Sequence, residues 1–210
     1  TAITAWELLF DSLKLSQGAG SGQYLLVLGA AGGVGSILIQ LAKKLTKLTV
    51  IATASRDETR DWVTKMGADH VIDHSQPLAP QMEALGITRH FVASLRGSDK
   101  NWPEIVQMAA PRAMVALIDD PQDLNINLGK QKALTIAWEF MFTRAMFAMD
   151  DMDEQGKLLN RVSQMIDDGH LQSTMTKRLG ALNAASLKAA HDEQETGRVI
   201  GKNVMAGLGA

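Results

Sequence analysis

The sequence predicts an α/β fold in which helices cover both faces of a parallel, doubly wound sheet of six strands. Short apolar runs that suit buried strands alternate with longer segments of helical periodicity over residues 1–150. A cluster of glycines also falls between the first apolar run and the helix after it, as expected for a tight strand-to-helix turn. With 210 residues, the chain is long enough to bury a sizeable core.

The elements of this sheet follow in order along the chain. Apolar residues recur at helical spacing over residues 2–15, so an amphipathic helix is expected first. The apolar run at residues 24–28 shows no alternation, which is typical of a strand buried on both faces. The next strands are expected at residues 48–53, 70–72, 90–94 and 113–118, and helices at 34–45, 56–66, 80–85 and 103–109.

The segment 133–147 is unusually rich in large apolar side chains. One interpretation is a sixth core strand that leads into a helix. The other is that these side chains remain at a sheet edge and pair with a second copy of the chain. The two interpretations are compatible, and we expect a homodimer through an edge strand that begins near Thr135 and ends near Phe142.

The pattern changes in the last part of the chain. Helices are expected at residues 155–168 and 183–196, and strands at 173–179 and 202–205. The parallel alternation is lost here, so these two strands are expected to belong to a sheet that the visible chain does not contain. The predicted organisation is therefore an α/β domain over residues 1–150 and a C-terminal extension over residues 151–210.

Composition and charge exclude several classes of function. The net charge is −2 and no long basic block occurs, so a nucleic-acid or anionic membrane surface has little electrostatic support. The sequence contains no run of 18 apolar residues without a charge, so no membrane span is predicted. Cysteine is absent, which removes disulfides and thiol nucleophiles and is compatible with the cytoplasm, where we expect the protein. The chain opens at Thr1 without Met, and we expect it to be part of a longer protein.

The chemistry of the sequence concentrates in the run GAAGGVG at residues 29–35. Ala30 keeps the turn tight, Gly32 lets backbone N–H groups approach a pyrophosphate, and Gly35 lets the helix pack closely on the strand. The helix N-terminus adds free N–H donors and partial positive charge. Since the turn follows a strand and opens a helix, it predicts a Rossmann dinucleotide site rather than a generic turn. The residues expected at this site are Ala30, Gly32, Gly33, Val34 and Gly35.

The end of the second strand indicates which dinucleotide is bound. An Asp or Glu about 20 residues after the glycines would accept a hydrogen bond from the ribose 2′-hydroxyl and repel a 2′-phosphate. Ala54 stands at that position, and Ser55 and Arg56 follow it. A hydroxyl and a guanidinium suit a phosphate, so we expect NADP(H) rather than NAD(H). The alternative is that Ser55 is the N-cap of the next helix and Arg56 a solvated residue in its first turn.

With these residues in place, the chain resembles the cofactor-binding half of the medium-chain dehydrogenase/reductase superfamily. It is most similar to zinc-type alcohol dehydrogenase-like proteins of the quinone oxidoreductase (zeta-crystallin-like) branch. The matching segments are TAWE at residues 4–7, AGGVG at 31–35, IQLA at 39–42, MGADHVI at 66–72, and Gly201 with Lys202 before the final strand.

This resemblance implies both a partner domain and a reaction. Members carry an N-terminal GroES-like substrate domain to which their C-terminal strands return, so the strands after residue 171 would complete a GroES-like domain missing from the visible chain. The implied reaction is hydride transfer from NADPH to a quinone, enone or related carbonyl compound. By resemblance, Thr4 lies near the nicotinamide, and loops at Ser94 and Ile118 line its cleft. These are positioning roles, and the sequence identifies no catalytic residue.

Two further patterns carry weaker hypotheses. His70 and His74 on an extended strand would lie about 13 Å apart at roughly 3.3 Å per residue, too far to share a metal. Asp119 and Asp120 are expected in a solvated loop. The family's zinc ligands lie mostly outside the visible chain, and we expect no metal site here. Besides the oxidoreductase, a nucleotide-binding or dimerisation module without catalytic activity of its own remains open.

Overall fold

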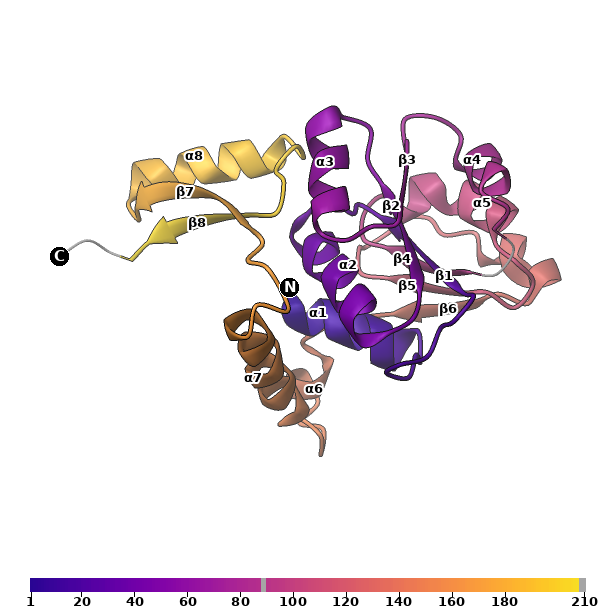
Figure 1. Cartoon of the computed structure of the whole chain (residues 1–210), viewed down its shortest axis with the longest axis horizontal. Coiled ribbons are helices and arrows are strands. Elements are labelled where there is room, and N and C mark those ends of the chain that lie inside the picture. Colours follow the sequence, from indigo (N-terminus) through magenta and orange to yellow (C-terminus); the bar gives the residue numbers. More distant parts are fainter. Residues whose placement is uncertain (88–89, 208–210) are drawn as a thin grey trace.

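The computed structural model describes residues 1–87 and 90–207, and its main body is one parallel sheet (Figure 1). The strands of this sheet are β1 (Tyr24–Leu28), β2 (Thr49–Thr53), β3 (His70–Ile72), β4 (His90–Ser94), β5 (Met114–Leu117) and β6 (Thr135–Trp138). Their order is β3-β2-β1-β4-β5-β6, and every neighbouring pair is parallel. The predicted six-stranded doubly wound sheet is therefore confirmed, and the strand order reverses direction between β1 and β4.

Helices cover both faces of this sheet. One face carries α1 (Ala2–Glu7), which continues into the π-helical turn η1 (Leu8–Ser12), together with α2 (Gly33–Leu45) and α3 (Asp57–Lys65). The other face carries α4 (Leu78–Ala84) and α5 (Ser98–Met108), and the 3-10 helix η2 (Ile126–Lys132) contacts α5. Side chains of β1 alternate between the two cores: Leu25 and Val27 join the first, and Leu26 and Leu28 join the second. The uniform apolar character of this strand follows from its burial on both faces.

Helix α5 begins at Ser98, earlier than the proline-based expectation of residue 103. The reason is a contact with the loop after β5. The Asp119 carboxylate accepts a hydrogen bond from the Ser98 backbone N–H at 2.8 Å and another from the Ser98 hydroxyl. A carboxylate at this place satisfies an amide that the helix itself leaves without a partner. Asp119 lies in a loop, as expected, but it is half-buried and hydrogen-bonded to Ser98, whereas Asp120 is exposed.

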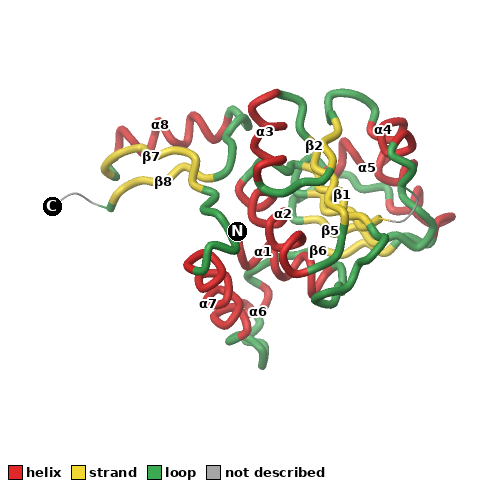
Figure 2. Tube along the Cα trace, viewed as in Figure 1, coloured by secondary structure: helices red, strands yellow, loops and turns green. Residues whose placement is uncertain are grey.

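The C-terminal region consists of a helix and a separate strand pair. Helix α7 (Glu154–Asp167) contacts α1, and β7 (Met175–Ala181) and β8 (Lys202–Ala206) pair in parallel, with α8 (Ala184–Glu195) as their crossover. The two strands thus lie outside the large sheet, as expected, and they pair with each other, which the sequence did not predict. Figure 2 shows the β7-α8-β8 unit beside the main body, to which loops connect it.

The strand β6 lies at an edge of the large sheet and leads through residues 139–142 into the short helix α6 (Thr143–Met146). The sixth strand is confirmed, and large side chains of the segment remain in solvent, whereas their pairing with a second copy stays a prediction. The exposed ones are Trp138, Phe140, Phe142, Met146 and Phe147. We call these five residues the edge patch. Among the described residues, no helix is long and apolar enough to cross a membrane.

Candidate functional site

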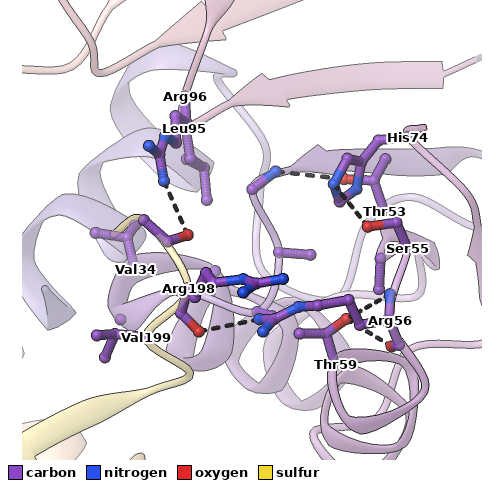
Figure 3. Close-up of a pocket in the computed structure, with 18 of the residues that line it drawn as sticks. Val34, Thr53, Ser55, Arg56, Thr59, His74, Leu95, Arg96, Arg198 and Val199 are labelled. Atoms are coloured by element: carbon purple, nitrogen blue, oxygen red, sulfur yellow. Dashed lines mark hydrogen bonds between the residues drawn. The ribbon is translucent and has the colours of Figure 1, made fainter. Parts of the chain in front are cut away.

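A cavity of about 360 Å³ opens at the carboxyl ends of the strands, beside the point where the strand order reverses (Figure 3). This is the position at which open α/β sheets bind ligands, and the volume lies within the range of ligand pockets. Its walls come from the glycine turn, from the ends of β2, β4 and β5, and from the loop between α8 and β8.

The glycine turn forms the cavity wall between β1 and α2. At Gly35, a Cβ atom would lie 2.3 Å from the Ala30 carbonyl oxygen, so only glycine lets the helix approach the turn this closely. A Cβ at Gly32 would meet its nearest atom, the Gly29 carbonyl oxygen, at 3.5 Å. Gly32 is the N-cap of α2 and provides no side-chain cap. The first amides of α2 are therefore open to an anion in the cavity.

The end of β2 supplies polar groups to the same cavity. Ala54 is fully buried, and beyond it the Ser55 hydroxyl lies 3.3 Å from His74 Nε2. Arg56 donates to the Arg198 carbonyl oxygen at 2.9 Å. Arg56, not Ser55, is the N-cap of α3, so the alternative assignment of Ser55 as the helix cap is wrong. Ser55 and Arg56 both line the cavity, as expected for residues that face a ligand.

The loop between α8 and β8, residues 196–201, crosses the cavity from the C-terminal unit. Arg96 donates to the Gly197 carbonyl oxygen at 3.2 Å, and the Gly201 N–H donates to the Ala31 carbonyl oxygen at 2.9 Å. Figure 3 shows Arg96 and Arg56 reaching this loop from the ends of two different strands. The following residue, Lys202, also lines the cavity.

The side chains that line this cavity are rich in positive charge, although one of them, Arg56, also forms an ion pair with Glu58 outside the lining. The described lining residues include four cationic side chains and no carboxylate. The cationic residues are Arg56, Arg96, Arg198 and Lys202. Sequence reasoning found only the first of these, because the others come from loops whose approach to the glycine turn depends on the tertiary fold. The run Gly201-Lys202 was visible in the sequence as a matching segment, without a role.

Two expected site residues lie outside the cavity lining. Ser94 is fully buried, and its hydroxyl is 2.7 Å from that of Ser98; its neighbours Leu95 and Arg96 line the cavity instead. Thr4 is 8% exposed and does not belong to the cavity lining. The other expected residues do line it: Ser55, Arg56, Ile118 and the five of the glycine turn.

Two carboxyl groups lie close together next to Thr4. Glu139 is 5% exposed, and its Oε1 atom is buried without a hydrogen-bond partner among the described residues. Burial, together with the negative charge of Glu7, raises the pKa of Glu139 to about 7. Glu7 itself is paired with Arg144 and accepts a hydrogen bond from Gln155 at 2.9 Å. Glu139 is therefore a carboxyl whose protonation is coupled to folding.

Metal ligands do not converge in the part of the chain that the structure describes. Within residues 1–87 and 90–207, no three His, Asp or Glu side chains come close enough to hold a metal ion. His70 and His74 belong to no such group, and cysteine is absent from the sequence. The described residues therefore do not fit a zinc ion.

Comparisons with known proteins agree with this arrangement. The model of the zinc-binding dehydrogenase family matches residues 33–153. A zinc-type alcohol dehydrogenase-like protein of Staphylococcus aureus is 35% identical over 208 residues, covering 98% of this chain and 62% of the relative. The human mitochondrial NAD(P)H oxidoreductase RTN4IP1 is 26% identical over 219 residues, covering 97% of this chain and 53% of that protein.

Among solved structures, a zinc-dependent alcohol dehydrogenase-type protein from Rhizobium etli superimposes with a TM-score of 0.93 at 51% identity. That match covers 100% of this chain and 62% of the Rhizobium protein. This chain thus spans less than two thirds of the length of these relatives.

Proposed function

This chain belongs to the zinc-binding dehydrogenase family, within the medium-chain dehydrogenase/reductase superfamily, and we propose that it binds NADP(H) in the cavity at the glycine turn. In this proposal, residues 1–150 form the cofactor domain of an oxidoreductase, and residues 151–210 extend from it toward a substrate domain. The protein acts on a quinone, enone or related carbonyl compound.

The charge of the cavity is the observation that carries the proposal. NADP(H) brings a diphosphate and a 2′-phosphate, and four cationic side chains with no carboxylate line the cavity. An acidic residue at the end of β2 would favour the ribose 2′-hydroxyl of NAD(H), and the buried Ala54 stands there instead. Charge-assisted hydrogen bonds to phosphate are stronger than neutral ones, so the cationic lining favours the phosphorylated cofactor.

The two phosphate groups fit different walls of the cavity. The uncapped first turn of α2, with Gly32, Gly33, Val34 and Gly35, suits the diphosphate, because its N–H donors are open and Gly32 leaves room for close approach. The group formed by Ser55, Arg56 and His74 suits the 2′-phosphate. Residues of both groups are therefore the proposed cofactor-binding residues.

The proposed reaction depends on the cofactor for its chemistry. When bound, the nicotinamide supplies or accepts the hydride, and this chain orients it and keeps water away from it. Ile118 and Leu95, at the ends of β5 and β4, supply apolar surface to the cavity. The similarity to an NAD(P)H oxidoreductase supports a redox reaction, and the quinone or enone substrate follows from the resemblance to the quinone oxidoreductase branch.

The proposed partner is a second copy of this chain. The strand β6 has an open edge, and the edge patch exposes five large apolar side chains beside it. An unpaired edge with apolar neighbours is a template for strand pairing, and two copies related by a twofold axis would cover both patches.

A fluorescence titration tests the cofactor assignment. Aliquots of NADPH and, separately, NADH are added to the chain while the reduced nicotinamide emission is followed. We expect saturable binding with NADPH at least about tenfold tighter, equivalent to about 1.4 kcal/mol. Equal or tighter binding of NADH would overturn the NADP(H) assignment. Binding of neither dinucleotide would instead favour the alternative of a dimerisation module.

A further inference from the structure

We propose that Glu58 sets the preference between NADPH and NADH, because its carboxylate competes with the cofactor's 2′-phosphate for the guanidinium of Arg56. The inference rests on the proposed function, since it concerns the 2′-phosphate end of the same cavity. The residues already proposed to hold this phosphate are Ser55, Arg56 and His74. Glu58 acts against them, so it limits the discrimination that they provide.

The Arg56 guanidinium is shared between two partners within the chain. Its Nη1 atom forms an ion pair with Glu58 Oε1 at 2.5 Å, and its Nη2 atom donates to the Arg198 carbonyl oxygen at 2.9 Å. Figure 3 shows the Arg56 side chain reaching this carbonyl group. Both amino groups of the fork that binds phosphate are thus engaged, and a bound 2′-phosphate has to displace or share one of these contacts. Of the two partners, only the Glu58 carboxylate carries a full negative charge that also repels the phosphate.

The backbone around Arg56 explains why Glu58 reaches it. Residues two apart do not face each other on an α-helix. Arg56, however, is the N-cap of α3 and has an extended conformation, with φ −107° and ψ 145°. The Thr59 hydroxyl fixes this conformation, because it donates to the Arg56 carbonyl oxygen at 2.7 Å and accepts from the Arg56 N–H at 3.2 Å. The ion pair therefore follows from the way in which the chain enters α3 after β2.

The strength of the ion pair allows a phosphate to compete with it. The Glu58 side chain is 61% exposed and that of Arg56 is 33% exposed, so solvent weakens their attraction. Arg56 is the cationic side chain among the described lining residues from Thr53 through Thr59, whereas Glu58 lies outside the lining. NADPH binding therefore includes the loss of a weak ion pair at this end of the cavity. NADH carries no 2′-phosphate and needs no such exchange, so Glu58 affects the two cofactors differently.

The test measures the affinities of Glu58→Gln for NADPH and NADH by fluorescence titration. We expect NADPH binding to tighten by about two- to fivefold, the range for release of an exposed ion pair, and NADH binding to stay unchanged. The double variant Arg56→Ala, Glu58→Gln gives a second readout. Without the guanidinium there is nothing to compete for, so Glu58→Gln should no longer change the affinity for NADPH. A residue with only a structural role in α3 would keep its effect in the absence of Arg56.

Asp57→Asn is the matched control. Asp57 is an exposed acidic residue in the same first turn of α3, and none of the ion pairs between the described residues involves it. The two variants remove the same charge at neighbouring positions, so an effect of overall charge on NADPH would appear in both to a similar extent. We expect Asp57→Asn to bind both dinucleotides much like the unaltered chain. Circular dichroism verifies that each variant is folded.

Several results would overturn the role of Glu58 and leave the proposed cofactor site standing. Unchanged NADPH affinity in Glu58→Gln would show that the two anions do not compete, and weaker NADPH binding would show that Glu58 orients Arg56 for the phosphate. An equal gain in Asp57→Asn, an equal gain for NADH, or a gain that persists without Arg56 would also overturn it. Failure of the unaltered chain to bind either dinucleotide would overturn the proposed function and this inference together.

Discussion

Two glycines in helices, Gly35 of α2 and Gly156 of α7, have opposite surroundings. A Cβ at Gly35 would lie 2.3 Å from a backbone oxygen, whereas a Cβ at Gly156 would meet nothing within 4 Å. Alanine is favoured over glycine in a helix by about 1 kcal/mol. Whether a glycine-to-alanine substitution raises or lowers the free energy of unfolding therefore depends on the room for the added Cβ atom. We expect Gly156→Ala to raise the free energy of unfolding by up to about 1 kcal/mol. Gly35→Ala should lower it by about 1–3 kcal/mol, as overpacking does.

Urea denaturation of both variants measures these changes. Equal effects of the two substitutions would contradict the packing account, because helix propensity alone treats the two positions alike.

Glu139 gives the stability of the chain a dependence on pH. Its pKa in the folded chain is raised from 4.5 to about 7, so the folded state binds the proton more tightly than the unfolded state. The free energy of unfolding should therefore fall as the pH rises from about 4.5 to about 7. Above pH 7 the Glu139 carboxyl is ionised in both states, and the loss of stability is complete. In Glu139→Gln this fall should disappear, with a gain on the order of 2 kcal/mol at pH 8.

Thermal or urea unfolding at a series of pH values measures this effect. Glu195→Gln, at an exposed glutamate near the end of α8, is the control and should keep the pH profile of the unaltered chain. Identical profiles for Glu139→Gln and the unaltered chain would show that this carboxyl is not the group that titrates.

At the scale of elements, α5 depends on a side chain from outside the helix. The Asp119 carboxylate holds the Ser98 N–H at the first residue of the helix. We expect Asp119→Ala to lower the free energy of unfolding by about 1–2 kcal/mol, as the loss of a helix cap does. The neighbouring Asp120 is exposed, and Asp120→Ala should change the free energy of unfolding by no more than about 0.5 kcal/mol. Chemical denaturation distinguishes the two, and an equal response would indicate that Asp119 is as solvated as its neighbour.

Local patterns predict the elements well where neighbouring residues determine them, and less well where distant residues do. The strand His90–Ser94 and the strand His70–Ile72 lie where sequence periodicity predicts them. The start of α5 was misplaced, because Asp119 lies beyond the helix in the chain. The pairing of β7 with β8 was missed because the crossover helix α8 has no buried residues and so gives little sign of a sheet beneath it.

In the whole molecule, the site likewise combines residues that local sequence patterns reveal with residues that only the tertiary fold brings together. The glycine turn, Ser55 and Arg56 line the cavity and were readable from the sequence, because they follow strands of a recognisable unit. Arg96, Arg198 and Lys202 were not readable as site residues, since the loop that brings them together depends on the C-terminal unit. The expected residues Ser94 and Thr4 are buried and do not line the cavity, and Leu95 and Arg96, which follow Ser94, line it instead.

The edge patch predicts the oligomeric state. We expect sedimentation velocity to show a dimer of the chain and to show a monomer for the double variant Phe140→Ser, Phe142→Ser, since these rings are more than half exposed beside the open edge of β6. Leu187→Ser, at an exposed leucine of α8 outside the patch, should leave the dimer intact. A monomeric unaltered chain, or a double variant that remains dimeric, would contradict the edge-strand interface.

If the cavity binds NADP(H) through its cationic wall, loss of the Arg56 guanidinium should change the ratio of the affinities for NADPH and NADH, which titrations of Arg56→Ala measure. Arg178→Ala, at an exposed arginine of β7 outside the cavity lining, is the control. We predict that Arg56→Ala weakens NADPH by about tenfold or more and leaves NADH nearly unchanged, because only NADPH carries the 2′-phosphate. An equal loss for both cofactors, or no loss for either, would contradict the claim.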